Sequence, residues 1–151
     1  MSTSRRDKRI VQLTGGDWYT RPAWYDILHA AGTAREVDLL ERTALRWCAC
    51  DWRGNMRWLE PACGSGRYLR TAAGRGIRAF GFDAEPAMIA YAQSRLTGAG
   101  LMRNHARVWV DRMESFAPLE GRERAHFAFN LINSIRHLHT DGDVLAHLDR
   151  V

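Results

Sequence analysis

Short apolar runs alternate with amphipathic stretches along most of the chain. Four runs have the length and composition of buried strands; they lie at residues 56–60, 78–83, 107–111 and 126–132. Helical spacing of apolar residues, bounded by glycine or proline, predicts a helix that ends near Gly74, a second from Pro86 to Leu96 and a third from Val144 to Val151. This alternation predicts an α/β fold: a doubly wound, mostly parallel sheet with helices on both faces.

The residues before the first predicted strand follow a different pattern. A helix is expected from Pro22 to His29, because proline suits a helix start. A second helix is expected to open with a capping box formed by Thr33 and Glu36. Three parts are therefore predicted: a mobile N-terminal arm at residues 1–16, a helical N-terminal cap at 17–54 and an α/β core at 55–151.

The turn after the first predicted strand contains two glycines, Gly64 and Gly66. Because glycine has no Cβ, the backbone can adopt a positive φ, and a ligand can lie directly on the loop. The amide groups that open the next helix point at that ligand. Strand, glycine turn and helix together are typical of a site where an α/β sheet binds a nucleotide-sized ligand at its carboxyl edge.

An acidic residue stands at or just beyond the end of each of the first three predicted strands: Glu60, Asp83 and Asp111. In a parallel sheet these ends share one edge, so the three carboxylates are expected around one crevice. Asp83 follows Gly64 by about 20 residues, the interval at which such an acid reaches a ribose. A carboxylate there accepts hydrogen bonds from both ribose hydroxyls and disfavours a 2′-phosphate. The alternative role for Asp83 is a helix N-cap.

Composition sets broad limits on the kind of protein. The chain has 151 residues, of which 46% are hydrophobic and 26% charged, as in a single globular domain. The net charge is +5, and Lys8 is the only lysine among 22 basic residues. The arginines are scattered, which favours ordinary surface charge over a polyanionic partner. Three cysteines without a paired framework, and no signal-peptide core, point to the cytoplasm. No apolar run is long enough to span a membrane.

With these residues the chain resembles the class I S-adenosylmethionine-dependent methyltransferases. Four stretches, at residues 59–67, 81–88, 110–113 and 129–134, are similar to the first four motifs of that family in order and spacing. The resemblance covers about residues 18–151 and implies a Rossmann-like core that binds S-adenosyl-L-methionine. Compared with the family, the sheet is expected to be truncated after its fourth strand, either as a fragment or because a partner chain completes it.

The resemblance implies a set of cofactor-binding residues. Asp83 would bind the ribose, the third motif would lie against the adenine, and Glu60 would favour the positively charged methionine end. The full expected set is Glu60, Ala62, Cys63, Gly64, Gly66, Asp83, Ala84, Met88, Asp111, Arg112, Met113 and Asn130.

The resemblance also implies the reaction. The acceptor attacks the sulfonium methyl group in line, and the protein mostly supplies proximity and alignment. Asn130 and His137 are expected near the transferred methyl group, with His137 as a candidate general base. Residues expected to shape the acceptor pocket are Trp18, Tyr19, Tyr25 and Asn133, with helix packing onto the sheet as the alternative for the aromatic ones. No metal site is expected, because the C-terminal histidines lack carboxylates at ligand spacing.

The acceptor is expected to be a small molecule. The fourth strand lacks the Asn/Asp-Pro-Pro-aromatic signature of enzymes that methylate nucleic-acid bases, but a nucleic-acid (RNA) methyltransferase stays open, as does a non-catalytic S-adenosylmethionine-binding module. Leu69 stands where the dinucleotide fingerprint needs a third glycine, which argues against a nicotinamide-dependent oxidoreductase. The oligomeric state is left open.

Overall fold

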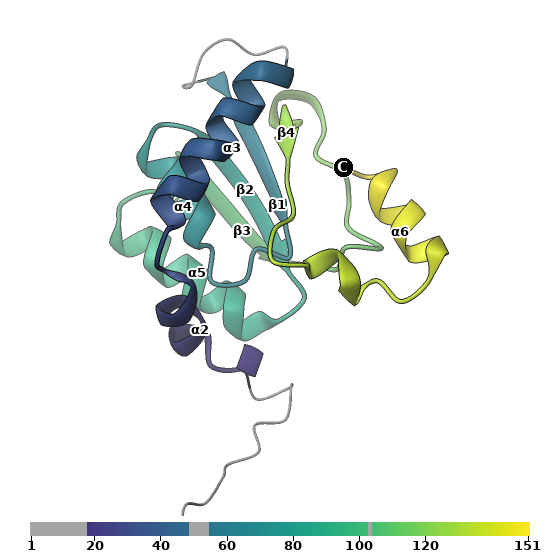
Figure 1. Cartoon of the computed structure of the whole chain (residues 1–151), viewed down its shortest axis with the longest axis horizontal. Coiled ribbons are helices and arrows are strands. Elements are labelled where there is room, and N and C mark those ends of the chain that lie inside the picture. The colour runs from purple at the N-terminus through teal and green to yellow at the C-terminus, as the bar shows by residue number, and fades with distance from the viewer. Residues whose placement is uncertain (1–17, 49–54, 103) are drawn as a thin grey trace, which may run out of the picture.

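A computed structural model describes residues 18–48, 55–102 and 104–151 (Figure 1). The expected arm at residues 1–16 and the last residues of the expected cap lie outside the described residues. The core is a four-stranded parallel sheet in the order β3-β2-β1-β4. The strands are β1 (Arg57–Pro61), β2 (Arg78–Asp83), β3 (Ala106–Val110) and β4 (Phe127–Ala128).

The helices follow the expected order along the chain. The α-helices are α2 (Pro22–His29), α3 (Thr33–Trp47), α4 (Arg67–Gly74), α5 (Pro86–Gly98) and α6 (Asp141–Leu148), and two short 3₁₀ helices are η2 (Gly121–Glu123) and η3 (Ser134–His137). Strand–helix alternation around a parallel sheet confirms the predicted α/β class. Among the described residues, no helix combines the length and apolar character needed to cross a membrane.

The two faces of the sheet carry alternate residues of each strand. Trp58 and Ala79 face the side covered by α4 and α5, and belong to a buried cluster with Leu69 and Ile89. Neighbouring residues, including Phe80, face the opposite side and pack with Met113 and Phe116 of the segment after β3. Because both faces of the sheet are buried, the strand sequences are continuous apolar runs and do not alternate between apolar and polar residues.

The strands are in register so that their carboxyl ends meet at one edge. Glu60 pairs with Gly81, and Asp83 pairs with Val110. The backbone N–H of Asp111 donates to the carbonyl oxygen of Asp83 at 3.1 Å. The acids at the ends of β2 and β3 are therefore neighbours. In Figure 1 this edge faces α2 and η3.

The expected capping box at the start of α3 is wrong. Gly32, with φ +84°, occupies the N-cap position, and Thr33 is already the first helical residue. The Thr33 hydroxyl instead donates to the carbonyl oxygen of Ala30 at 2.9 Å, and Glu36 accepts hydrogen bonds from α4. A capping box does form at α6, between Thr140 and Asp143.

The fourth strand is much shorter than the apolar run at 126–132 predicts. Only Phe127 and Ala128 pair with β1, opposite Trp58 and Leu59. Beyond Phe129 the chain leaves the sheet, because Ile132 adopts a φ of +58°, which is incompatible with an extended strand.

Candidate functional site

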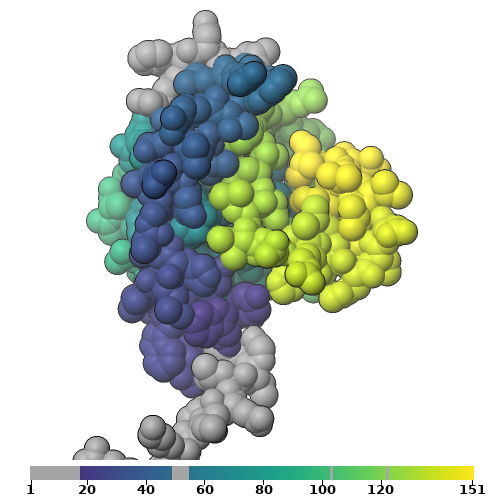
Figure 2. Space-filling view, viewed as in Figure 1, coloured from purple at the N-terminus to yellow at the C-terminus, as the bar shows by residue number. Residues whose placement is uncertain are grey.

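A cavity of about 590 Å³ opens at the carboxyl ends of the strands. This volume falls within the range of small-molecule and cofactor sites. The N-terminal helices and the segment around η3 meet on the face shown in Figure 2, and both contribute to its walls. The lining residues are Trp18, Tyr19, Tyr25, His29, Ala62, Gly64, Phe82, Asp83, Ala84, Glu85, Met88, Asp111, Arg112, Met113, Glu114, Ile132, Ser134, His137 and His139.

The two glycines of the turn after β1 have different functions. Gly64 lines the cavity with φ +52°, and a Cβ built there would lie 3.4 Å from Cε1 of Tyr25. Gly66 has φ +69° at the N-cap of α4, and a Cβ there would come within 3.0 Å of the Cβ of Ala92. The absent Cβ of Gly64 therefore lets the Tyr25 ring lie close to the loop, whereas that of Gly66 lets α4 and α5 pack closely.

Asp83 is the carboxylate that organises this loop. Its Oδ2 accepts the N–H of Gly64 at 2.8 Å, and its Oδ1 accepts the N–H of Glu85 at 2.9 Å. Burial raises the pKa of Asp83, and the two backbone hydrogen bonds oppose that rise. The N-cap of α5 is Glu85, whose side chain accepts the N–H of Ala87 at 3.2 Å, so Asp83 is not the N-cap.

The third expected motif forms one end of the cavity. Asp111 accepts the indole N–H of Trp109 at 3.2 Å through Oδ2 and the N–H of Arg112 at 2.9 Å through Oδ1. The guanidinium of Arg112 is exposed and pairs with Glu114. The buried thioether of Met113 supplies an apolar surface beside these polar groups. A polar rim around an apolar floor suits a planar heterocycle.

Glu60 lies beneath the loop and does not line the cavity. Its side chain is buried, and its Oε2 accepts no hydrogen bond from any described residue. Burial raises the pKa of Glu60 well above its ordinary value, while Arg67 lowers it and Asp83 raises it further. A buried acceptor without a donor is rare in native structures and marks a place where a further donor fits.

Four other expected residues also do not line the cavity. The Cys63 side chain faces the core near Gly81, and burial raises the pKa of its thiol well above the ordinary value. Gly66 packs against α5, as described above. The Asn130 amide donates to the carbonyl oxygen of Pro61 at 2.9 Å and accepts the N–H of Ile135 at 3.1 Å, so it holds η3 against the end of β1. Asn133 is exposed at the N-cap of η3.

The expected aromatic residues form one wall of the cavity. The Tyr25 ring stacks on His29, with centroids 4.2 Å apart, and meets Trp18 edge to face at 6.3 Å. The Tyr19 hydroxyl lies 3.4 Å from Nε2 of His137, which links this wall to η3 across the cavity. The aromatic cluster thus lines the cavity.

Backbone strain is concentrated in the same region. Among the described residues, three non-glycine residues have a positive φ: Ala62, Ile132 and Asn133. All three follow the ends of β1 and β4, and two of them line the cavity. Strained backbone of this kind clusters at ligand-binding loops and active sites.

Several lining residues did not stand out from the sequence. His29, Phe82, Glu114 and His139 have no spacing that distinguishes them from core or surface residues. Two could have been found: Glu85, which stands directly before a proline at a helix start, and Ser134, which lies in the fourth motif. Within the described residues, no group of three histidine, cysteine, aspartate or glutamate side chains is placed to hold a metal ion.

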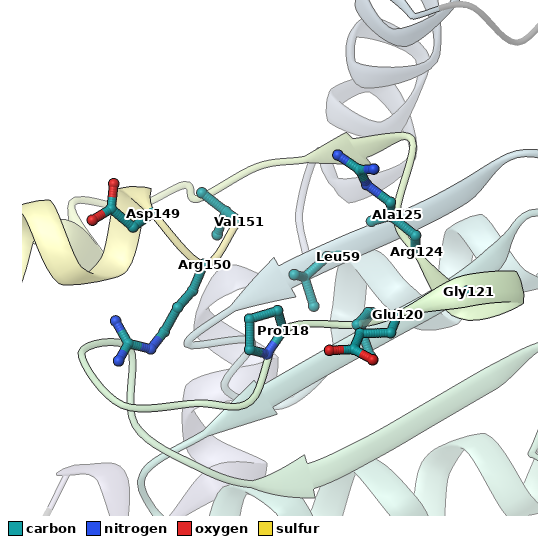
Figure 3. A pocket seen from close by; sticks show the side chains of 10 residues that line it. Leu59, Pro118, Glu120, Gly121, Arg124, Ala125, Asp149, Arg150 and Val151 are labelled. Atoms are coloured by element: carbon teal, nitrogen blue, oxygen red, sulfur yellow. The ribbon is translucent and has the colours of Figure 1, made fainter.

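A second cavity, of about 360 Å³, lies on the side of β1 opposite α4 and is bordered by the end of α6. Leu59 and Pro118 lie at its centre, and Figure 3 shows the charged ends of Asp149 and Arg150 directed away from them. Two further charged residues, Glu120 and Arg124, also line it. None of the residues expected to bind cofactor or acceptor lines it.

The parallel sheet, its glycine turn and its acid-lined cavity define a doubly wound α/β domain that binds a nucleotide-type ligand at the carboxyl edge. A family model described as "Methyltransferase domain" matches residues 59–151, and the chain belongs to this family. The expected resemblance to the class I S-adenosylmethionine-dependent methyltransferases is thereby confirmed. A comparison with curated proteins found no match.

Solved structures share the fold at low sequence identity. A S-adenosylmethionine-dependent methyltransferase from Clostridium acetobutylicum has a TM-score of 0.65 and 14% identity, covering 89% of this chain and 51% of that one. One from Aquifex aeolicus has a TM-score of 0.63 and 18% identity, covering 86% of this chain and 66% of that one. A TehB-like S-adenosylmethionine-dependent methyltransferase from Corynebacterium glutamicum has a TM-score of 0.59 and 23% identity. The match covers 85% of this chain and 62% of that one. The chain thus spans between 51% and 66% of the length of these structures.

Proposed function

We propose that this chain binds S-adenosyl-L-methionine in the acid-lined cavity and transfers its methyl group to a small-molecule acceptor by in-line displacement. The observation that carries the proposal is the environment of Asp83. A carboxylate has about four lone-pair sites, and the N–H groups of Gly64 and Glu85 use two of them. The remaining two suit the two hydroxyls of an unphosphorylated ribose.

The other lining residues fit the rest of that cofactor. Asp111 and Met113 offer an acceptor and an apolar surface to an adenine ring. Gly64 and the Tyr25 ring that packs beside it both line the cavity, so both would border the ligand. The unpaired Oε2 of Glu60, beneath the glycine turn, would accept a hydrogen bond from the ammonium group of the methionine end if that group reached it.

The bound sulfonium supplies an electrophilic methyl group, so the chain itself needs mainly to hold the acceptor in line with it. The wall formed by Trp18, Tyr19 and Tyr25 would orient an apolar or aromatic acceptor. His137, at the opposite side, would take a proton where the acceptor loses one. Asn130 would act indirectly, because both ends of its amide already hold the loop.

A small acceptor fits the space that this cavity leaves beside a cofactor. Structures of the same fold include a geranyl diphosphate C-methyltransferase from Streptomyces coelicolor and a magnesium protoporphyrin IX methyltransferase from Synechocystis, so the fold accommodates such acceptors. An RNA acceptor needs a basic surface next to the cavity, and Arg112, a lining arginine, already pairs with Glu114.

Calorimetric titration of S-adenosylhomocysteine tests the proposal. The parent chain should bind, and Asp83→Asn should bind at least about tenfold more weakly. The amide can accept only one of the two backbone N–H groups and turns its NH₂ toward the other. Asp38→Asn, on the exposed side of α3, serves as the control and should bind like the parent. A folded parent that does not bind would refute the proposed function, and equal binding by Asp83→Asn would refute the role of Asp83.

A further inference from the structure

Helix α2 carries Tyr25 of the wall over the cavity, yet none of its buried residues is apolar. Its one buried residue is Asp26, at 6% exposure. Trp24, Ile27 and Leu28 are 52%, 74% and 62% exposed. Most surface helices dock through an apolar stripe. Something other than hydrophobic burial must therefore hold α2 in place.

The Asp26 carboxylate makes that connection to three separate elements. Its Oδ1 accepts the hydroxyl of Ser65, in the glycine turn, at 3.0 Å. Its Oδ2 accepts the hydroxyl of Tyr91, on α5, at 3.0 Å, and lies 3.7 Å from the guanidinium of Arg70, on α4. Hydrogen bonds to a buried charged acceptor are among the strongest that a protein makes.

The position of Asp26 couples this anchor to the site. Tyr25, its neighbour on α2, lies over Gly64, while Ser65 follows Gly64 in the turn. The same carboxylate thus fixes both the glycine turn and the helix whose Tyr25 ring packs against it, and Gly64 and Tyr25 both line the cavity. We infer that Asp26 is a positioning residue: it holds the aromatic wall of α2 in register with the glycine turn and thereby sets the affinity for the cofactor. This inference rests on the proposed function.

The first test compares S-adenosylhomocysteine affinity by calorimetry. Asp26→Leu keeps the volume but accepts no hydrogen bond, so affinity should fall about tenfold or more as the competent position of α2 loses population. Asp26→Asn can still accept from Ser65 and donate to the Tyr91 oxygen, so it should stay within about threefold of the parent. Tyr91→Phe removes one bond and should fall between them. The control is Asp38→Asn, which changes an exposed aspartate on α3.

A double-mutant cycle separates positioning from a general loss of structure. If Asp26 acts through Tyr25, then Asp26→Leu should cost little further affinity in a Tyr25→Ala background. Chymotrypsin cleavage after the exposed Trp24, on α2, should also speed up in Asp26→Leu while the far-ultraviolet circular dichroism stays that of the parent. If Asp26→Leu does not fold, Tyr91→Phe is carried through the same cycle.

The outcomes separate this inference from the proposed function. If the parent binds S-adenosylhomocysteine and both Asp26→Leu and Tyr91→Phe bind it equally well, the positioning role is overturned and the proposed function stays intact. The positioning role is also overturned if the losses of affinity caused by Asp26→Leu and Tyr25→Ala are additive in the double variant. A parent that does not bind refutes the proposed function, and unchanged chymotrypsin cleavage after Trp24 in Asp26→Leu would then overturn the anchoring role as well.

Discussion

Arg67 is a buried cation whose removal should be costly. Its Nη1 donates to the Thr33 hydroxyl at 2.6 Å and to Oε2 of Glu36 at 2.8 Å, and its Nη2 donates to the hydroxyl of Tyr68. Tyr68 in turn donates to the same carboxylate at 2.9 Å. The network joins the first turn of α4 to α3. Arg67→Met keeps most of the side-chain volume while removing every one of these bonds.

The size of the loss follows from burial on the two sides of the pair. The Arg67 side chain is 5% exposed, but that of Glu36 is 40% exposed, so water can solvate the carboxylate once the arginine is gone. Burial raises the pKa of Glu36, but the hydrogen bonds from Tyr68 and Arg67 outweigh it and lower the pKa overall. Breaking a fully buried pair costs about 3–5 kcal/mol, and the exposure of Glu36 reduces this to about 2–4 kcal/mol.

Urea unfolding followed by circular dichroism measures this loss as a difference in the free energy of unfolding. Glu123→Gln is the control, because it removes an ion pair with Arg107 in which both side chains are more than 40% exposed. Such a pair contributes about 0–1 kcal/mol. A loss below about 1 kcal/mol for Arg67→Met, no larger than that of the control, would refute the view that this network holds α3 to the core.

Two further substitutions test the interior around the glycine turn. Because burial raises the folded-state pKa of Glu60, its stabilising contribution is complete below the ordinary pKa of about 4.3 and is lost as the pH rises through the raised pKa. Glu60→Gln cannot ionise, so its free energy of unfolding should decline less than that of the parent as pH rises; parallel curves contradict this. Gly81→Ala should cost about 1–3 kcal/mol, because the new Cβ would overlap Leu69 and approach Cys63. Gly98→Ala, with no neighbour within 4 Å, is its control, and an equal loss in both refutes the packing reasoning.

The strands and helices of the core could be predicted because burial leaves a clear period in the sequence. The structure places β2 at the predicted residues, Arg78–Asp83, where an apolar run ends at an acid. The end of β4 could not be predicted in this way. Leu131 and Ile132 continue the apolar pattern, but the chain turns at Ile132 through a positive φ. Periodicity reports which residues are apolar, not where the backbone bends.

The site was predictable to the extent that strand ends define it. Asp83 is the last residue of β2 and Asp111 directly follows β3, and both line the cavity as expected. Glu60 is still within β1, so the pleat directs its side chain beneath the loop. Nor could the sequence reveal the part played by Asp26, because a single aspartate on a helix with exposed apolar neighbours has no distinguishing spacing.

Three consecutive residues of the glycine turn are each held by a different element. The N–H of Gly64 is bound to Asp83 at the end of β2, and the hydroxyl of Ser65 is bound to Asp26 on α2. Gly66 is confined by Ala92 of α5. A ligand that meets a loop already fixed in this way has little conformational entropy left to remove, which raises its affinity. The carboxylates of Asp83 and Asp26 should therefore affect binding by different routes. Asp83 lines the cavity and can meet the ligand directly, whereas Asp26 does not line it and is hydrogen-bonded to Ser65 and Tyr91, so Asp26 acts through the order of the loop and its cover.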